Sequence, residues 1–101
     1  MAPLELLVLK TLEAGPNHGF GITLHVQEAS GGLLGVEEGS LYPALHRLEK
    51  DGALAAEWST TPAGRRARLY RLTAAGKKRL AKAEEQWTVV SKGMAKLMRF
   101  A

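Results

Sequence analysis

Apolar and polar residues along the chain follow three successive patterns: helical, alternating and again helical. Over residues 3–14, apolar side chains recur at intervals of three and four. This spacing predicts an amphipathic helix, which Gly15-Pro16 ends. A second helix is expected over about 18–29. We expect its core side to carry Phe20, Leu24 and Ala29, with Ile22 and Val26 flanking them.

A third helix is expected over about 38–51, where the buried stripe is Leu41, Leu45 and Leu48. Its start has two alternatives. If Ser40 is the N-cap, Pro43 falls in the first helical turn, where a missing N–H costs little. If the helix begins near Glu37, Pro43 lies deeper and removes one intrahelical hydrogen bond.

Alternation with a period of two follows the third helix and predicts a hairpin over about 54–72. Pro62 and Gly64 mark its turn. The inner end of the second strand carries Tyr70 and Leu72, which suit a core, and the outer end carries arginines, which suit a projecting tip. Thr73 is expected to cap a last helix that runs from 74 to near the C-terminus.

The predicted order is therefore helix, helix, helix, hairpin, helix. This fold class is mainly α with a small β-hairpin: a winged helix-turn-helix over residues 1–73, plus a C-terminal dimerisation helix over 74–101. The length of 101 residues suits one domain, whose own core would be small, so a partner subunit would add stability.

Composition narrows the class of protein. The chain has no cysteine, no signal-peptide pattern and no uncharged apolar run approaching the roughly 20 residues of a membrane span. We therefore expect a cytoplasmic protein with no membrane partner and no cofactor. An enzyme is not expected, because Ser40 lacks a nucleophile-elbow context and no Gly-rich phosphate loop occurs. The three histidines lack ligand spacing, so a zinc site is the less favoured alternative; they are His18, His25 and His46.

The charge is distributed unevenly along the chain. The net charge is +4, and the segment 58–83 contains no acidic residue but holds eight of the fourteen basic ones. A one-sided basic block indicates a polyanionic partner such as double-stranded DNA. The alternative is a solvated basic face.

Two groups of residues are candidates for contacting DNA. The outward side of the third helix carries hydrogen-bonding and cationic groups that fit the major groove: Ser40, Tyr42, Pro43, His46, Arg47 and Lys50. The hairpin tip carries three arginines without a nearby counter-charge, suited to phosphates or the minor groove: Arg65, Arg66 and Arg68. The alternatives are an ordinary amphipathic surface helix and a charged edge strand that prevents aggregation.

The last helix carries an apolar seam with alternating spacings of three and four, which is typical of a helix that packs on a second copy. The seam positions are Leu80, Ala83, Trp87, Val90, Met94, Leu97 and Ala101. The alternative is packing on the parent domain. In a dimer, Trp87 would lie near its mate and could stack on a flat aromatic effector; otherwise it is a packing residue.

Three motifs follow one another along the chain: Leu4 to Leu9 followed by Gly15 to Ile22, then Gly39 to Leu48, then Arg65 to Gly76. Together and in this order they resemble the PadR family of transcriptional regulators. The resemblance implies a bacterial homodimeric repressor that binds an inverted-repeat operator and is nucleoid-associated when bound. It favours Ser40, Tyr42 and Pro43 on the reading helix, His18 and Gly19 at the start of the second helix, and the wing arginines.

The resemblance also has a departure and an extension. The family often has serine-proline where this chain has Glu37-Glu38; two carboxylates suit a helix N-terminus but repel phosphates. The single last helix resembles the family's smaller subgroup, and some members sense phenolic acids or bind aromatic drugs near their last helices.

A winged-helix module that binds protein instead of DNA is the second function class, and the wing arginines favour DNA over it.

Overall fold

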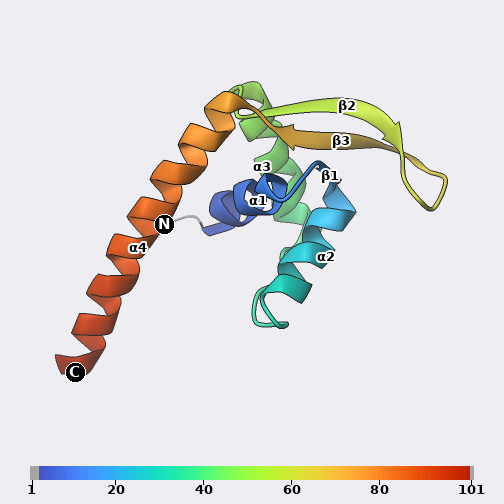
Figure 1. The fold of residues 1–101 in the computed structure, drawn as a ribbon. Coiled ribbons are helices and arrows are strands. Elements are labelled where there is room, and N and C mark those ends of the chain that lie inside the picture. Colours follow the sequence, from blue (N-terminus) through green and yellow to red (C-terminus); the bar gives the residue numbers. More distant parts are fainter. Residues whose placement is uncertain (1–2, 101) are drawn as a thin grey trace.

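The computed structural model describes residues 3–100. Figure 1 shows three short helices gathered under a hairpin, with a long helix leaving the body on the opposite side. The elements are α1 (Pro3–Glu13), β1 (Asn17–His18), α2 (Gly19–Ala29), α3 (Glu38–Lys50), β2 (Leu54–Thr60), β3 (Arg66–Leu72) and α4 (Ala74–Phe100). The predicted order of helices and hairpin is confirmed. Within the described residues, no helix combines the length and apolar character needed to cross a membrane.

The sheet contains a third strand that the sequence pattern did not predict. β1 pairs antiparallel with β3, so that Asn17 faces Tyr70 and His18 faces Leu69. β2 pairs with the other side of β3, from Leu54 opposite Leu72 to Thr60 opposite Arg66. Two residues are too few to show an alternating pattern, so the sequence alone does not reveal β1. The strand forms because one edge of β3 is open to it.

The core lies between α1, α2, α3 and the inner end of the hairpin. Its fully buried side chains include Val8, Leu9, Ile22, Leu41, Leu45, Leu48 and Leu80. The predicted stripe of α3 is therefore confirmed, and Ala44 joins it on the buried side. The amphipathic helix expected over residues 3–14 is also present, and it buries Val8, Leu9, Thr11 and Leu12. Because Leu80 belongs to this core, the base of α4 is part of the same packed body.

The predicted buried side of α2 is wrong. Phe20 and Leu24 are 61% and 41% exposed, whereas Ile22 and Val26 are buried. The two pairs have the same spacing of four, so periodicity alone could not separate them. Gly19 lies in line with Ile22 and Val26 and has no side chain, which lets this face approach α3 closely.

The start of α3 follows the earlier of the two alternatives. Glu37 is the N-cap residue, with extended backbone and no side-chain cap, and its carbonyl oxygen accepts hydrogen bonds from the N–H groups of Ser40 and Leu41. Pro43 therefore lies inside the helix. It has no N–H to donate to Gly39 four residues earlier, so one intrahelical bond is missing.

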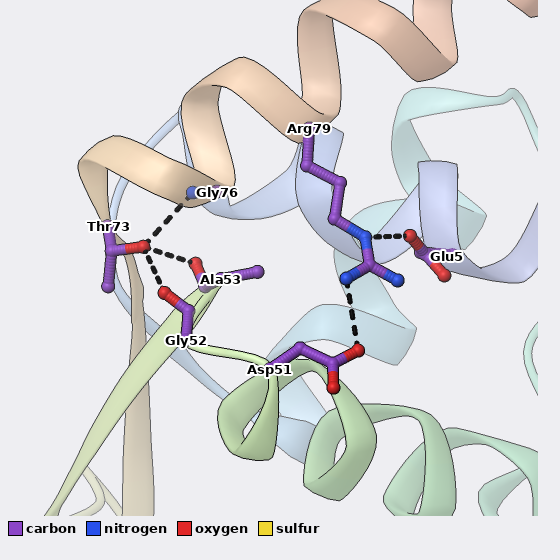
Figure 2. A network of polar contacts seen from close by, with 7 residues as sticks. All are labelled: Glu5, Asp51, Gly52, Ala53, Thr73, Gly76 and Arg79. Carbon is purple, nitrogen blue, oxygen red and sulfur yellow. Dashed lines mark hydrogen bonds and ion pairs between the residues drawn. The ribbon is translucent and has the colours of Figure 1, made fainter.

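The entry of α4 is fixed by polar contacts around Thr73, as the sequence predicted. The Thr73 Oγ1 accepts a hydrogen bond from the Gly76 N–H at 3.0 Å, and donates toward the carbonyl oxygens of Gly52 and Ala53 at 2.7 and 2.9 Å. One turn further along, Arg79 joins three helices: its Nε donates to Glu5 of α1, and its Nη1 lies 3.1 Å from Asp51 at the end of α3 (Figure 2). These contacts set the direction in which α4 leaves the body.

Candidate nucleic-acid interface

The outward side of α3 is polar and open to solvent. Its buried side is filled by Leu41, Ala44, Leu45 and Leu48. The six residues that the sequence singled out for base or phosphate contacts are all exposed: Ser40, Tyr42, Pro43, His46, Arg47 and Lys50. They follow consecutive turns of one continuous helix, so they form one surface that a groove of DNA could receive.

The start of α2 lies against this surface but is less accessible than expected. Gly19 is buried, and a Cβ atom placed on it would come within 2.8 Å of the Tyr42 ring. His18 is half-buried; its Nε2 is enclosed and has no hydrogen-bond partner within the described residues. The structure thus brings Gly19 and Tyr42 together, and Gly19 serves as the small residue on which Tyr42 rests.

The wing is the part of the hairpin beyond the core, and its side chains alternate between two faces. Arg66 and Arg68 lie on the same face as Trp58, and their guanidinium carbons are 5.5 and 5.6 Å from the centre of its ring. We call these three residues the wing face. Trp58 is 58% exposed and was not among the predicted site residues. The signal was present, because Trp58 continues the alternation of Leu54 and Ala56 out to the wing.

The third wing arginine lies in the turn itself. The backbone N–H of Arg65 donates to the Thr61 Oγ1 at 3.2 Å, and its carbonyl oxygen accepts from the Thr61 N–H at 2.7 Å. The side chain of Arg65 is exposed and, within residues 3–100, Arg65 and Arg66 form no ion pair. These two arginines are therefore available to an external anion.

The expectation that the wing arginines have no counter-charge is wrong for Arg68. Its Nη2 lies 2.6 Å from the Glu49 Oε2, and the two side chains are 34% and 31% exposed. Glu49 comes from the last turn of α3, nineteen residues earlier in the chain. The contact connects α3, whose outward side is polar, directly to the wing face.

Tyr70 lies at the inner end of the same sheet face and is almost fully buried. Its burial raises the pKa of the phenol above the usual value of 10.0, and the positive charge of Arg68 partly opposes that shift. The phenol of Tyr70 therefore keeps its proton to a higher pH than the phenol of an exposed tyrosine.

The predicted seam on α4 divides into a packed part and an open part. Leu80 is 1% exposed and lies in the core of its own chain, so its assignment to a dimer interface is wrong. Ala83 is half-buried, and the next four positions are exposed: Trp87, Val90, Met94 and Leu97. Ala101, the last position of the predicted seam, lies outside the described residues.

An open groove of about 720 Å³ runs between the start of α1 and the middle of α4. Pro3 and Leu6 line it from α1, and Ala83, Trp87 and Val90 line it from α4. The groove therefore coincides with the first open part of the seam. Over residues 3–100, no three side chains of the metal-binding types cluster closely enough to hold an ion.

A family model described as the transcriptional regulator PadR-like family matches residues 8–82. The chain belongs to this PadR-like family of transcriptional regulators. The matched residues include all of α3 and the wing, and the motifs that pointed to the family in the sequence lie mostly within them. The family named from the sequence is therefore confirmed.

Known transcriptional regulators resemble the chain in sequence and in structure. Transcriptional regulator Rv3488 of Mycobacterium tuberculosis is 41% identical over 76 residues, which are 75% of this chain and 67% of that protein. A transcriptional regulator from Clostridium thermocellum superposes with a TM-score of 0.83 at 26% identity, covering 93% of this chain and 91% of that one. Bacillus subtilis PadR in complex with operator DNA gives a TM-score of 0.72 at 26% identity, covering 81% of this chain and 45% of that longer one. The expected winged-helix fold is confirmed.

Proposed function

We propose that this PadR-like regulator represses transcription by binding an inverted-repeat operator as a homodimer. The observation that carries the proposal is the continuity between the exposed polar side of α3 and the wing face, which Glu49 and Arg68 join at 2.6 Å. Side chains of α3 would read base edges in the major groove, and Arg65 and Arg66 would hold phosphates beside it. Bacillus subtilis PadR, which shares the fold, was solved with operator DNA. No catalytic step is part of this function, and its place is the bacterial cytoplasm.

The open part of the α4 seam supports the dimer. Trp87, Val90, Met94 and Leu97 are apolar, follow the spacing of a two-helix seam and are between 38% and 62% exposed. A second copy that presents the same residues would bury them by two-fold symmetry. Two reading helices would then face two half-sites, which is why the proposed operator is an inverted repeat.

A flat aromatic effector is the proposed inducer. The groove beside Trp87 offers an indole face and aliphatic walls, on which such a molecule could stack. The two wings can be arranged so that they fit the operator or so that they do not. The effector would release DNA only if its affinity were higher for the arrangement that does not fit. The test adds planar aromatic compounds to the Trp58→Phe variant, whose remaining tryptophan is Trp87, and follows tryptophan fluorescence and operator release together. If Trp87 acts only in packing, no compound of the panel will both quench the fluorescence and release the operator.

The test of DNA binding is a selection from random duplexes, followed by affinity measurements over a salt series. We expect an inverted repeat to emerge. Its log Kd should rise with log salt concentration, because bound arginines and lysines release condensed counterions, with a slope of about 0.9 for each phosphate contact. A salt-independent affinity, or no preference over random duplex, would contradict the proposal and favour a protein-binding winged helix.

A further inference from the structure

Arg68 differs from its two neighbours in the wing because its charge is already partnered. Its ion pair with Glu49 is short, at 2.6 Å, and both side chains are about two-thirds shielded from water. At that burial a pair persists better than an exposed surface pair, which salt and side-chain motion weaken. Arg68 is therefore not a free cation, whereas Arg65 and Arg66 form no ion pair among the described residues.

Glu49 holds a position that no other acidic residue of the wing region shares. It projects from the last turn of α3, whose outward side carries the proposed reading residues, and reaches the sheet face that carries Trp58 and Arg66. The pair thus spans the two elements that must contact DNA together. A brace of this kind fixes the angle between the wing and the reading helix.

Trp58 determines where Arg68 would lie without Glu49. Its ring is 5.6 Å from the Arg68 guanidinium carbon and 5.5 Å from that of Arg66, so it attracts both cations through its π face. A released Arg68 would stay at the wing surface beside Arg66. It would there form an additional phosphate contact that is independent of DNA sequence.

We infer that Glu49 is a specificity-determining residue: by binding Arg68 it withholds one cation from random DNA and keeps the wing in register with the reading helix. The inference deepens the proposed function and rests on it. Random duplex is bound through charge, so it gains from every free arginine. An operator is bound through base contacts that need the correct angle between α3 and the wing, so it gains less or loses. Glu49 thereby widens the difference between the two affinities.

The test compares Glu49→Gln with Glu57→Gln. Both variants remove one negative charge from the wing region, but Glu57 is exposed, lies on the sheet face opposite Trp58 and forms no ion pair among the described residues. We expect Glu49→Gln to bind random duplex about three- to tenfold more tightly at low salt, with a salt slope steeper by about 0.9. The ratio of random to operator Kd should fall by a similar factor. For Glu57→Gln, both affinities should rise slightly and together, with an unchanged slope.

An Arg68→Gln background and a heparin column complete the experiment. In that background the two glutamate variants should behave alike, because the cation that Glu49 restrains is gone. Heparin elution needs only a polyanion: Glu49→Gln should elute at higher salt than Glu57→Gln even if the wild type prefers no duplex, an outcome that would contradict the proposed function alone. Equal elution and equal slopes for the two variants, with folding verified by circular dichroism, would overturn the role of Glu49. A weaker grip of Glu49→Gln on random duplex would overturn it as well.

Discussion

Tyr42 combines a packing contact with an exposed position on the outward side of α3. Its ring is 48% exposed on the outward side of α3, and the end of the ring that carries the hydroxyl lies against Gly19 of α2. A tyrosine held in this way has few accessible rotamers, so its hydroxyl is presented in a defined direction at little further cost in entropy.

Substitutions on α3 and on the wing should therefore have different effects. Tyr42→Ala or Ser40→Ala should reduce discrimination between operator and random duplex by about 1–3 kcal/mol, if a base contact is lost.

Arg65→Ala combined with Arg66→Ala should weaken binding to all duplexes by a similar factor, because phosphate contacts position the protein and do not read sequence. Competition binding assays on both DNAs measure the two effects. A folded wing variant with wild-type affinity would contradict the assignment of the wing.

Tyr70 predicts a change of stability at alkaline pH. Burial raises the pKa of its phenol in the folded chain above the 10.0 of an unfolded one. Below about pH 10 the group is neutral in both states, and its contribution is fully present. As the pH rises further, the unfolded chain loses the proton first, so stability is lost until the folded pKa is passed.

Urea unfolding at about pH 9 and about pH 11 measures this loss. The wild type should lose more stability over that interval than Tyr70→Phe, which has no phenol to titrate. Tyr42→Phe is the matched control, since it removes a hydroxyl from a half-exposed ring. The same loss in wild type and Tyr70→Phe would show that other groups control the alkaline limit.

The wing illustrates where sequence reasoning on single residues stops. A strand turns its side chains with a period of two, so the sequence is enough to group Arg66, Arg68 and Tyr70 on one face. The partner of Arg68 could not be read in this way. Glu49 lies on a different element, and a distance between side chains of two elements depends on how those elements pack.

At the scale of whole elements, the lengths of helices and strands followed from periodicity, and their faces followed less well. α3 was assigned correctly because its leucines form one apolar stripe and the opposite side is polar. α2 was not, because it is apolar on two sides and the core uses the side that contains Gly19. The entry of α4 was predictable from Thr73, since a hydroxyl at an N-cap has a local partner.

The Arg79 network is an element-scale contact that the sequence did not reveal. It ties α4 to α1 and to the end of α3, and the pairing raises the pKa of Arg79 above its usual value, so the charge persists at every accessible pH. Because the side chain is 38% exposed, water and salt weaken the pair. Arg79→Met should lower the free energy of unfolding by about 1 kcal/mol, a drop of roughly 4–8 °C in the melting temperature. Lys78→Met, on an exposed neighbouring position, should change it little.

High salt provides the second half of that test. Added salt should bring the melting temperatures of Arg79→Met and wild type closer together, because it screens an ion pair and not an aliphatic contact. A difference that is independent of salt would mean that Arg79 acts through its aliphatic chain.

The whole molecule is elongated, with principal dimensions of 53 × 28 × 22 Å, because α4 continues beyond the body that it packs against. The sequence indicated this overhang, since the apolar seam outlasts what three short helices and a hairpin can cover. It did not show where the seam leaves the core. That point lies between Leu80, which is buried, and Trp87, which is 42% exposed.

Oligomeric state is the prediction that belongs to this scale. Val90→Asp places two like charges at the seam of the proposed dimer, so the chain should sediment as a monomer. Its operator affinity should fall by about 100-fold or more, because the second half-site is no longer bound within one complex. Thr88→Asp adds the same charge to an exposed position of α4 off the seam and should remain dimeric. A monomeric wild type, or a dimeric Val90→Asp, would refute this interface.

Gly76, in the first turn of α4, lies too close to the Ala53 backbone to carry a side chain. An added Cβ there would lie 2.1 Å from the Ala53 carbonyl oxygen, too close for a backbone atom to accommodate without movement. A helix of 27 residues is about 40 Å long, so a tilt of about 10° at its foot displaces its far end by about 7 Å. The direction of α4 therefore depends on the close contact between Gly76 and the Ala53 carbonyl oxygen, where one added methyl group would force a shift. If two copies pair along α4, Gly76→Ala should change the spacing between half-sites that the protein prefers. A selection from a library in which only that spacing varies, while each half-site keeps its sequence, measures the change.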